Sequence, residues 1–249
     1  MQSREPTNQS TSDLTYFAAM RDFFWRDEAD LIEKVDAFPK YASRQSIAKF
    51  LTKYERFKRI LHVNGSIVEC GVLHGAGLLA WAKLSSILEP VNHTRKVIGF
   101  DTFSGFPNVT PEDTGSGASA HVVVGGLFGS TLDNVEGAVA IYDTNRPLGH
   151  IPKVELVKGD IAETAPEYVA QNRHLVVSLL YLDLDLYAPT KAALKTFLPR
   201  MPMGAIVCFD ELNARSFPGE TVAVDELLGV DNLRIERFPF DPYVSFAVL

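Results

Sequence analysis

The chain has 249 residues, of which 46% are hydrophobic, and its 24 lysines and arginines against 31 aspartates and glutamates give a formal net charge of −7. This length and composition fit one α/β domain with an additional helical segment. An acidic chain with no cluster of basic residues is poorly suited to the phosphates of a nucleic acid, so we exclude DNA and RNA as partners.

The two cysteines, Cys70 and Cys208, each lie in an apolar run that predicts a buried strand. Two such cysteines make neither a disulfide framework nor a zinc site, and reduced core thiols are typical of a cytoplasmic protein. Residues 1–12 are polar, lack the apolar segment of a signal peptide and are predicted to form a disordered tail. The longest apolar run, 175–182, is far shorter than the ~20 residues of a membrane span, so we expect a cytoplasmic protein outside the membrane.

Residues 13–62 are predicted to form an N-terminal helical segment. Apolar residues recur at helical spacing over 13–38 and again over 43–61, and Pro39 separates the two helices. We expect these helices to cover one edge of the sheet that follows. A part in closing a substrate pocket or in forming a homodimer stays open.

From residue 63 to residue 249 short apolar runs alternate with helical patterns. The runs at 66–70, 96–100, 154–157, 175–182 and 205–209 predict buried strands, and helices are predicted over 76–88, 133–143, 161–171, 189–198 and 217–227. Such alternation is typical of a parallel sheet covered on both faces. Two further strands, 233–237 and 244–248, follow with no helix between them. The predicted fold is therefore α/β: a Rossmann-like, doubly wound, mostly parallel seven-stranded sheet that ends in an antiparallel hairpin.

The connection from 102 to 130 is long for a compact domain. Loops of this length usually serve as lids over a functional site or are flexible insertions. We predict a mobile lid over the active site at about residues 108–150, with a plain flexible insertion as the alternative. The glycines of the 102–130 connection are Gly105, Gly115, Gly117, Gly125, Gly126 and Gly129.

Polar residues at the ends of the predicted strands form the candidate site, because ligands of an open parallel sheet bind beyond the carboxyl ends of its strands. The first strand ends in Glu69, and Gly71 and Gly75 follow in a turn that lets the backbone approach a ligand. Glu69 would hold the ammonium group of a ligand or be satisfied by nearby backbone N–H groups.

The second and third strands end in further carboxylates. Asp101 is placed to accept hydrogen bonds from two ribose hydroxyls, and Thr102 and Ser104 follow it in the same run. Asp160 comes after the third strand, where it would accept from an adenine amino group, cap the next helix, or do both.

The fourth strand leads into Asp183 and Asp185, and strand alternation would put both on one face. Two neighbouring carboxylates at a buried strand end are costly unless a cation or a proton lies between them. Asp210 and Glu211 end the neighbouring fifth strand, so three or four carboxylates would converge. Oxygen ligands of this kind suit Mg²⁺, Mn²⁺ or Ca²⁺ rather than zinc. The structural alternative is that the two aspartates cap the next helix.

Together these motifs resemble the macrocin-type (TylF-like) sugar O-methyltransferases of antibiotic biosynthesis, which belong to the class I S-adenosylmethionine-dependent methyltransferases. The resemblance extends over about residues 66–226 and is carried by ECGVLHG, DTFSGFP, GD, LDLDLY and DE at the five strand ends. Glu211 stands where the family usually has a second aspartate, and Leu184 stands where it usually has glycine.

The resemblance implies an enzyme that transfers a methyl group from S-adenosylmethionine to a hydroxyl of a small molecule, either a sugar or a glycosylated natural product. Asp183, Asp210 and Glu211 would hold a divalent metal, and Asp185 would be the general base. The cofactor site would be lined by Glu69, Gly71, Gly75, Asp101, Thr102, Ser104, Asp160 and Asp183.

Two other interpretations stay open. Tyr187 and Lys191 match the Y-x-x-x-K motif of an NAD(P)-dependent short-chain dehydrogenase. The glycine turn that begins at Gly71 also fits the cofactor turn of such an enzyme, and Asp101 fits its ribose carboxylate. Pro189 best fits the first turn of a helix, which would leave Tyr187 outside that helix and off the face of Lys191. The second alternative is a non-catalytic binding protein on a methyltransferase fold, which the complete set of carboxylates disfavours.

Overall fold

The apolar runs form one seven-stranded sheet with the order β3-β2-β1-β4-β5-β7-β6 in the computed structural model, which describes residues 10–249. Neighbouring strands from β3 to β5 are parallel, and β7 is antiparallel to both β5 and β6. The predicted Rossmann-like sheet with its closing antiparallel strands is confirmed. The strands are β1 (Ser66–Cys70), β2 (Val97–Asp101), β3 (Val154–Lys158), β4 (Val177–Leu182), β5 (Ile206–Phe209), β6 (Glu236–Arg237) and β7 (Ser245–Val248).

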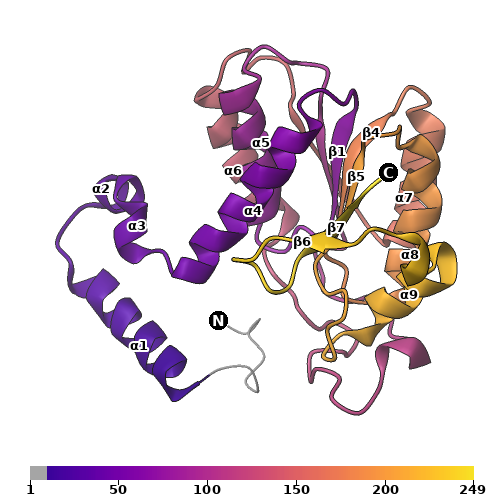
Figure 1. Ribbon diagram of the computed structural model, residues 1–249. Coiled ribbons are helices and arrows are strands. Elements are labelled where there is room, and N and C mark those ends of the chain that lie inside the picture. Colours follow the sequence, from indigo (N-terminus) through magenta and orange to yellow (C-terminus); the bar gives the residue numbers. More distant parts are fainter. Residues whose placement is uncertain (1–9) are drawn as a thin grey trace. The chain divides into compact units, whose positions relative to one another are not determined.

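Helices cover both faces of the sheet (Figure 1). α5 (Ala76–Leu88) and α6 (Leu132–Thr144) lie on one face, and α7 (Ile161–Gln171), α8 (Tyr187–Phe197) and α9 (Pro218–Leu228) lie on the other. Trp81 and Tyr181 belong to the first core, and Phe100 and Phe197 belong to the second. β1, β4 and β5 are buried throughout, so polar side chains are least costly at or beyond the ends of these strands.

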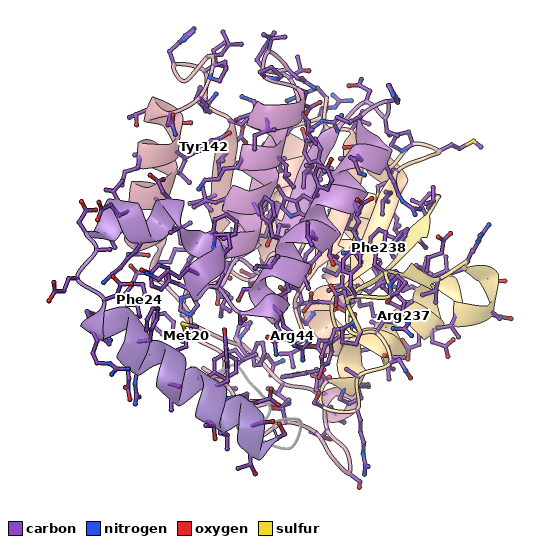
Figure 2. The ribbon with its side chains drawn as sticks, turned by 60° about the vertical axis from the view of Figure 1, so that its left-hand side comes forward. Met20, Phe24, Arg44, Tyr142, Arg237 and Phe238 are labelled. Carbon is purple, nitrogen blue, oxygen red and sulfur yellow. The ribbon has the colours of Figure 1, made fainter. Side chains whose placement is uncertain are left out.

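The C-terminal strands are fixed by an aromatic cluster around a buried arginine. Phe238, marked in Figure 2, stacks on Phe246 with ring centroids 5.4 Å apart. The Arg56 guanidinium lies over both rings and donates from Nη2 to the Val244 carbonyl at 2.9 Å. This cluster ties β6 and β7 to the C-terminal half of α4 (Arg44–Ile60), which agrees with the helix predicted over 43–61.

The chain divides into two units, residues 1–51 and 52–249. The division falls inside α4, whereas the sequence placed that whole helix in the N-terminal segment. In the first unit the prediction of one continuous helix over 13–38 is wrong. Three helices occupy that stretch: α1 (Thr11–Arg26), α2 (Leu31–Asp36) and α3 (Phe38–Tyr41). A capping box at Asp30, which accepts from the Glu33 N–H at 2.9 Å, starts a new helix there.

α1 begins earlier than predicted. Ser10 caps it by accepting from the Asp13 N–H at 3.2 Å, so residues 10–12 are not part of a tail, and the remainder of the predicted tail, residues 1–9, lies outside the described residues. α1 and α2 are joined by the Lys34 ammonium, which donates to the carbonyl of Phe24 (marked in Figure 2) at 2.9 Å.

The connection between β2 and α6 is held at several points. Phe106 and Gly125 are hydrogen-bonded, as are Ser119 and Ser216, both at 2.8 Å. The connection contains one short 3-10 helix, η2 (Pro111–Asp113). Val135 and Tyr142 of α6 belong to the core, so the second half of the proposed 108–150 lid is part of the fold. A lid function for the first half stays a prediction.

Cys70 and Cys208 are buried, unbonded thiols on β1 and β5, as expected for core residues. Burial raises the pKa of both, so neither is an activated nucleophile. Within residues 10–249, every helix is too short or too polar to cross a membrane.

Candidate active site

The carboxyl ends of β1 and β4 meet at Gly71. Its φ is +93°, and a Cβ there would lie 1.8 Å from the backbone oxygen of Asp183. The Asp183 N–H in turn donates to the Cys70 carbonyl at 2.8 Å. Glycine is therefore required here by the chain's own backbone, whereas the sequence suggested the approach of a ligand. The contact holds Asp183 beside the turn that follows β1.

Glu69 is buried beneath that turn, with 2% of its surface exposed. A Cβ on Gly77 would lie 1.9 Å from Glu69 Oε1, so the carboxyl contacts the first turn of α5. Its Oε2 has no hydrogen-bond partner among residues 10–249. Burial raises the pKa of Glu69 to about 7, although the nearby Lys53 ammonium opposes this shift. The Trp81 indole N–H also acts on this carboxyl and lowers its pKa, so Oε2 is the oxygen to which a ligand's ammonium group would donate.

Lys53 is a site residue that the sequence analysis missed. It is 8% exposed, and its Nζ lies 3.6 Å from the ring centroid of Tyr181 and 4.7 Å from that of Trp81. A signal was available, because Lys53 stands four and seven residues before the buried Phe57 and Ile60 and so shares their helical face. The α4 helix thereby supplies a buried cation next to the carboxyl ends of β1 and β4.

Asp101 uses both carboxylate oxygens within the turns it joins. Its Oδ2 accepts from the N–H groups of Val72 at 2.7 Å and Leu73 at 2.9 Å, and its Oδ1 accepts from the Phe103 N–H at 2.6 Å. Each carboxylate oxygen has two lone pairs, so a ribose hydroxyl would share Asp101 with these donors. The predicted ribose contact remains a prediction.

The hydroxyl side chains after β2 have different environments. Thr102 Oγ1 donates to the Gly105 carbonyl at 2.6 Å and accepts from the Ser104 N–H at 3.2 Å, so it shapes its own turn. The Ser104 side chain is exposed. Gly75, with φ +77°, is the N-cap of α5 and provides no side-chain cap. The first N–H groups of α5 are therefore suited to an anionic group of a ligand.

Asp160 caps α7. Its Oδ1 accepts from the Ala162 N–H at 2.9 Å, which confirms the helix-cap interpretation of this residue. The adenine contact, which the remaining lone pairs permit, stays a prediction.

Asp185 lies in a strained turn between β4 and α8. β4 ends at Leu182, so the strand alternation that placed Asp183 and Asp185 on one face stops before both, and that argument was wrong. Asp185 has φ +61° and is 8% exposed, and the next residue, Leu186, donates to the Leu184 carbonyl at 2.6 Å. Such a conformation costs roughly 1–3 kcal/mol in a non-glycine residue and persists only where the surroundings enforce it.

α8 begins at Tyr187 rather than at 189, so the argument that Pro189 separates Tyr187 from Lys191 was also wrong. The Lys191 ammonium donates to the Tyr187 hydroxyl and, at 2.7 Å, to Glu226 Oε2 on α9. Lys191 and Glu226 are 28% and 46% exposed, which makes this group a surface ion pair between two helices.

Carboxylates from three places, the end of β4, the end of β5 and the start of α9, influence one another electrostatically. Asp210 is 5% exposed and accepts from the Tyr181 hydroxyl. Glu220, in the first turn of α9, is fully buried, and its Oε1 accepts from the Glu211 N–H at 3.0 Å. Burial, together with the charges of Asp210, Asp185 and Glu211, raises the pKa of Glu220 well above its ordinary value. Glu220 was not predicted from the sequence, because an acidic residue in the first turn of a helix is expected on the surface.

These carboxylates do not form a ready metal site. Within residues 10–249, no three or more His, Cys, Asp and Glu side chains are arranged to hold a metal ion. Mg²⁺ prefers oxygen donors, which the predicted ligands Asp183, Asp210 and Glu211 have. Their side chains are not placed around one point, as coordination of an ion requires. The metal site stays a prediction.

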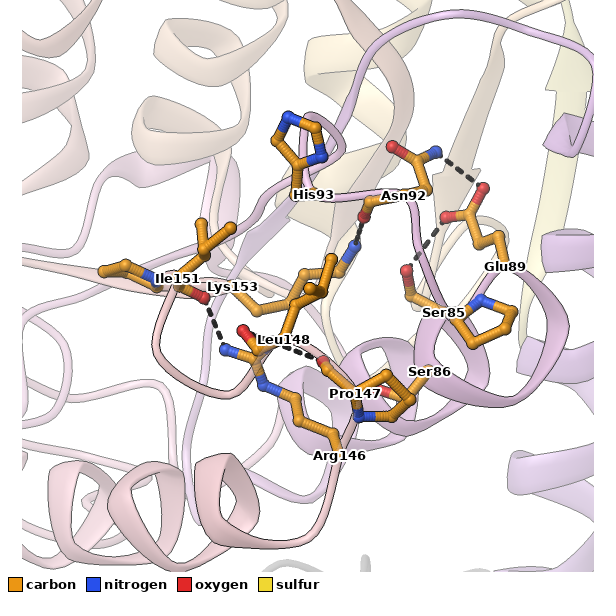
Figure 3. Close-up of a pocket in the computed structure, with 12 residues that line it drawn as sticks. Ser85, Ser86, Glu89, Asn92, His93, Arg146, Pro147, Leu148, Ile151 and Lys153 are labelled. Carbon is orange, nitrogen blue, oxygen red and sulfur yellow. Dashed lines mark hydrogen bonds between the residues drawn. The ribbon is translucent and has the colours of Figure 1, made fainter.

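A separate pocket lies at the amino ends of β2 and β3, away from these residues (Figure 3). Two cationic side chains of this pocket are hydrogen-bonded to backbone carbonyls. Lys153 donates to the Asn92 carbonyl and Arg146 to the Ile151 carbonyl, both at 2.6 Å. No strand contributes its carboxyl end to this pocket, so we do not place the reaction there.

Comparison with known proteins gives a consistent result. Residues 47–232 match the family model described as macrocin-O-methyltransferase (TylF). The crystal structure of CalS11, calicheamicin methyltransferase, is 30% identical, with 97% of this chain and 94% of that chain covered and a TM-score of 0.92. An apo structure of CalS11, there described as a TDP-rhamnose 3'-O-methyltransferase, is 30% identical, with coverages of 97% and 96% and a TM-score of 0.83.

The O-methyltransferase NovP is similar in fold, with 21% identity, coverages of 81% and 79% and a TM-score of 0.65. No curated protein sequence matches the chain. The dehydrogenase and the non-catalytic interpretations find no support among these similarities.

Proposed function

The chain belongs to the macrocin O-methyltransferase (TylF) family and is an S-adenosylmethionine-dependent O-methyltransferase, and we propose that its acceptor is a sugar hydroxyl, on a nucleotide sugar or a glycosylated natural product. The observation that carries this proposal is the 30% identity, over 97% of the chain, to a protein described as a TDP-rhamnose 3'-O-methyltransferase.

The cofactor would lie over the turns after β1 and β2. Glu69, whose Oε2 has no hydrogen-bond partner among the described residues, would accept from the cofactor's ammonium group. Asp101 would bind the ribose while it holds the two turns together. Gly75 would leave the first N–H groups of α5 to the cofactor carboxylate.

We assign the role of general base to Asp185. The hydroxyl proton would pass to its carboxylate while an oxygen lone pair forms the new O–CH₃ bond. The C–S bond would break with its electron pair returning to sulfur, which gives S-adenosylhomocysteine. Placing the hydroxyl in line with the methyl group supplies much of the rate, and a general base contributes typically about 10²–10⁴-fold.

We also propose that a divalent cation, Mg²⁺ or Mn²⁺ or Ca²⁺, binds at Asp183, Asp210 and Glu211. The support is chemical: the donors are oxygens, and the neighbouring Glu220 experiences the negative charge of Asp210 and Glu211. Because these side chains are not arranged around a common point, binding would need their rearrangement. A cation there would lower the pKa of the acceptor hydroxyl.

The function is tested by calorimetry with S-adenosylhomocysteine and by methyl transfer to TDP-rhamnose, followed by mass spectrometry. Asp185→Asn should bind S-adenosylhomocysteine like the wild type and lose at least about 100-fold in turnover. Asp133→Asn, an exposed site on α6, is the matched control. Full turnover in Asp185→Asn would exclude Asp185 as the base, and a protein that does not bind S-adenosylhomocysteine would overturn the cofactor assignment.

The cation is tested separately. EDTA should abolish methyl transfer and Mg²⁺ should restore it, and titration of the EDTA-treated protein with Mg²⁺ should release or absorb heat. Unchanged turnover in EDTA, together with no heat on adding Mg²⁺, would remove the cation from the proposal and leave the role of Asp185 intact.

A further inference from the structure

Asp113 is a buried carboxylate in the connection between β2 and α6, with 1% of its surface exposed. Its Oδ2 accepts from the Thr110 N–H at 2.8 Å and the Thr110 hydroxyl at 2.9 Å, which closes η2. Its Oδ1 accepts from the Tyr187 N–H at 2.6 Å, across 74 positions of sequence. One oxygen therefore holds the loop and the other holds the first residue of α8.

The same carboxylate lies at the start of α9. A Cβ on Gly219 would be 2.0 Å from Asp113 Oδ1 and 2.5 Å from the Tyr187 nitrogen, so this glycine allows the two helix ends to meet there. The N-caps of the two helices, Leu186 and Phe217, have no polar side chain to offer. A negative charge is favoured at a helix N-terminus, and Asp113 supplies one to both helices.

The turn that this contact fixes carries Asp185, two residues before Tyr187. Asp185 is held at φ +61°, and its neighbour Leu186 is hydrogen-bonded back to Leu184. Strain of this kind persists only where flanking contacts enforce it. The bond from Asp113 to the Tyr187 N–H is such a contact, and it comes from the long loop rather than from β4 or α8.

We propose that Asp113 is a positioning residue for methyl transfer, which fixes the β4–α8 turn from the loop so that the Asp185 carboxylate faces the acceptor hydroxyl. This inference rests on the proposed role of Asp185 as general base. The hydrogen-bond partners of Asp113 are Thr110 and Tyr187, so the cofactor contacts proposed at Glu69, Gly75 and Asp101 do not depend on it.

The first test compares Asp113→Ala and Asp113→Asn with Glu112→Ala, its exposed neighbour in η2. With TDP-rhamnose as acceptor, Asp113→Ala should lower kcat on the order of 100-fold, the effect of a displaced catalytic group. The affinity for S-adenosylhomocysteine should stay within twofold. Asp113→Asn keeps an acceptor for the Tyr187 N–H but loses the charge and the acceptor for the Thr110 N–H, so it should recover part of the activity. Glu112→Ala should match the wild type.

The second test needs no acceptor. Hydrogen–deuterium exchange read by mass spectrometry, with S-adenosylhomocysteine bound, should be at least tenfold faster over residues 184–190 in Asp113→Ala than in the wild type. Exchange over α7, residues 161–171, should be unchanged and serves as the internal control. Unchanged exchange over 184–190 would overturn the proposal even if TDP-rhamnose is not the acceptor.

A double mutant separates this inference from the function on which it rests. In the Asp185→Asn background, Asp113→Ala should lower kcat no further, because no base remains to be positioned. If Asp185→Asn keeps full activity, the assignment of the base fails. If Asp185→Asn is inactive while Asp113→Ala has the kcat of the wild type, only the role of Asp113 fails. An Asp113→Ala protein that also loses S-adenosylhomocysteine binding would show a merely structural role.

Discussion

The buried carboxyl of Glu69 connects cofactor binding to pH. Burial raises its pKa to about 7 in the free protein, so at pH 6 the group is mostly protonated. An ammonium group beside it favours the ionised form and lowers this pKa again. A ligand that brings its ammonium group to Glu69 at pH 6 must therefore expel a proton.

We predict that S-adenosylhomocysteine binding at pH 6 releases about one proton, and that little is released at pH 8, where Glu69 is already ionised. Calorimetry in two buffers with different ionisation enthalpies measures this number. Glu69→Gln should abolish the release at pH 6, whereas Glu136→Gln, at an exposed position of α6, should keep it. Proton release that persists in Glu69→Gln would place the cofactor's ammonium group elsewhere.

At the scale of single residues, the sequence identified polar residues at strand ends but not their partners. Asp101 was found because it ends an apolar run, yet its three backbone donors come from two different turns. Glu220 escaped because burial of a charge on a helix depends on neighbouring elements that a single-sequence pattern does not contain. Lys53 could have been found from its spacing to Phe57 and Ile60.

At the scale of elements, the junction of β1 and β4 depends on the absence of a side chain at Gly71. Its φ of +93° disfavours any L-residue, and a Cβ would lie 1.8 Å from the Asp183 backbone oxygen. We predict that Gly71→Ala lowers the free energy of unfolding by at least about 3 kcal/mol, as backbone strain and a steric clash combine. Urea denaturation measures this loss.

The control for Gly71 is Gly137, an exposed glycine inside α6 with no other atom within 4 Å of the position of its Cβ. Gly137→Ala should raise the free energy of unfolding by about 0.5–1 kcal/mol, because alanine is the better helix former. A Gly71→Ala protein as stable as Gly137→Ala would mean that the β1–β4 junction relaxes easily.

Element boundaries were predictable where a cap or a turn marks them in the sequence. The helix predicted over 161–171 was right because Asp160 caps it. The helix predicted over 13–38 was wrong because the capping box formed by Asp30 and Glu33 was overlooked. The start of α8 at Tyr187 was not predictable in the same way, because its capping group, Asp113, comes from a distant loop.

At the scale of the whole molecule, the topology followed from the sequence because apolar strands alternating with helices allow few arrangements. The path of the 102–130 connection did not follow, because a glycine-rich stretch carries no periodicity. Its ties, such as Ser119 to Ser216 and Asp113 to Tyr187, join segments that are far apart in the chain. The arrangement of the carboxylates at the ends of β4 and β5 and in α9 could not be predicted for the same reason, because it depends on contacts between segments far apart in the chain.

Two buried carboxyls, Glu69 and Glu220, set how the stability of the whole molecule depends on pH. Burial raises the pKa of Glu69 from 4.5 to about 7 and that of Glu220 well above 4.5. Between the unfolded and the folded pKa the folded state binds more protons than the unfolded chain. The contribution of these two carboxyls to the free energy of unfolding is therefore fully present below pH 4.5. It is lost as the pH rises through the pKa values of the folded protein.

We predict that the free energy of unfolding, measured with urea in EDTA and without cofactor, falls from pH 5 to pH 7.5, with Glu69 alone contributing roughly 2 kcal/mol. The range stops at pH 7.5 because Lys153, whose pKa burial lowers to about 8, acts in the opposite direction above it. Glu220→Gln keeps an acceptor for the Glu211 N–H, so it should flatten the slope and stabilise the protein at pH 7.5, while Glu136→Gln should leave the slope unchanged. A free energy of unfolding that stays constant or rises over this range would show that neither carboxyl has a raised pKa in the folded protein.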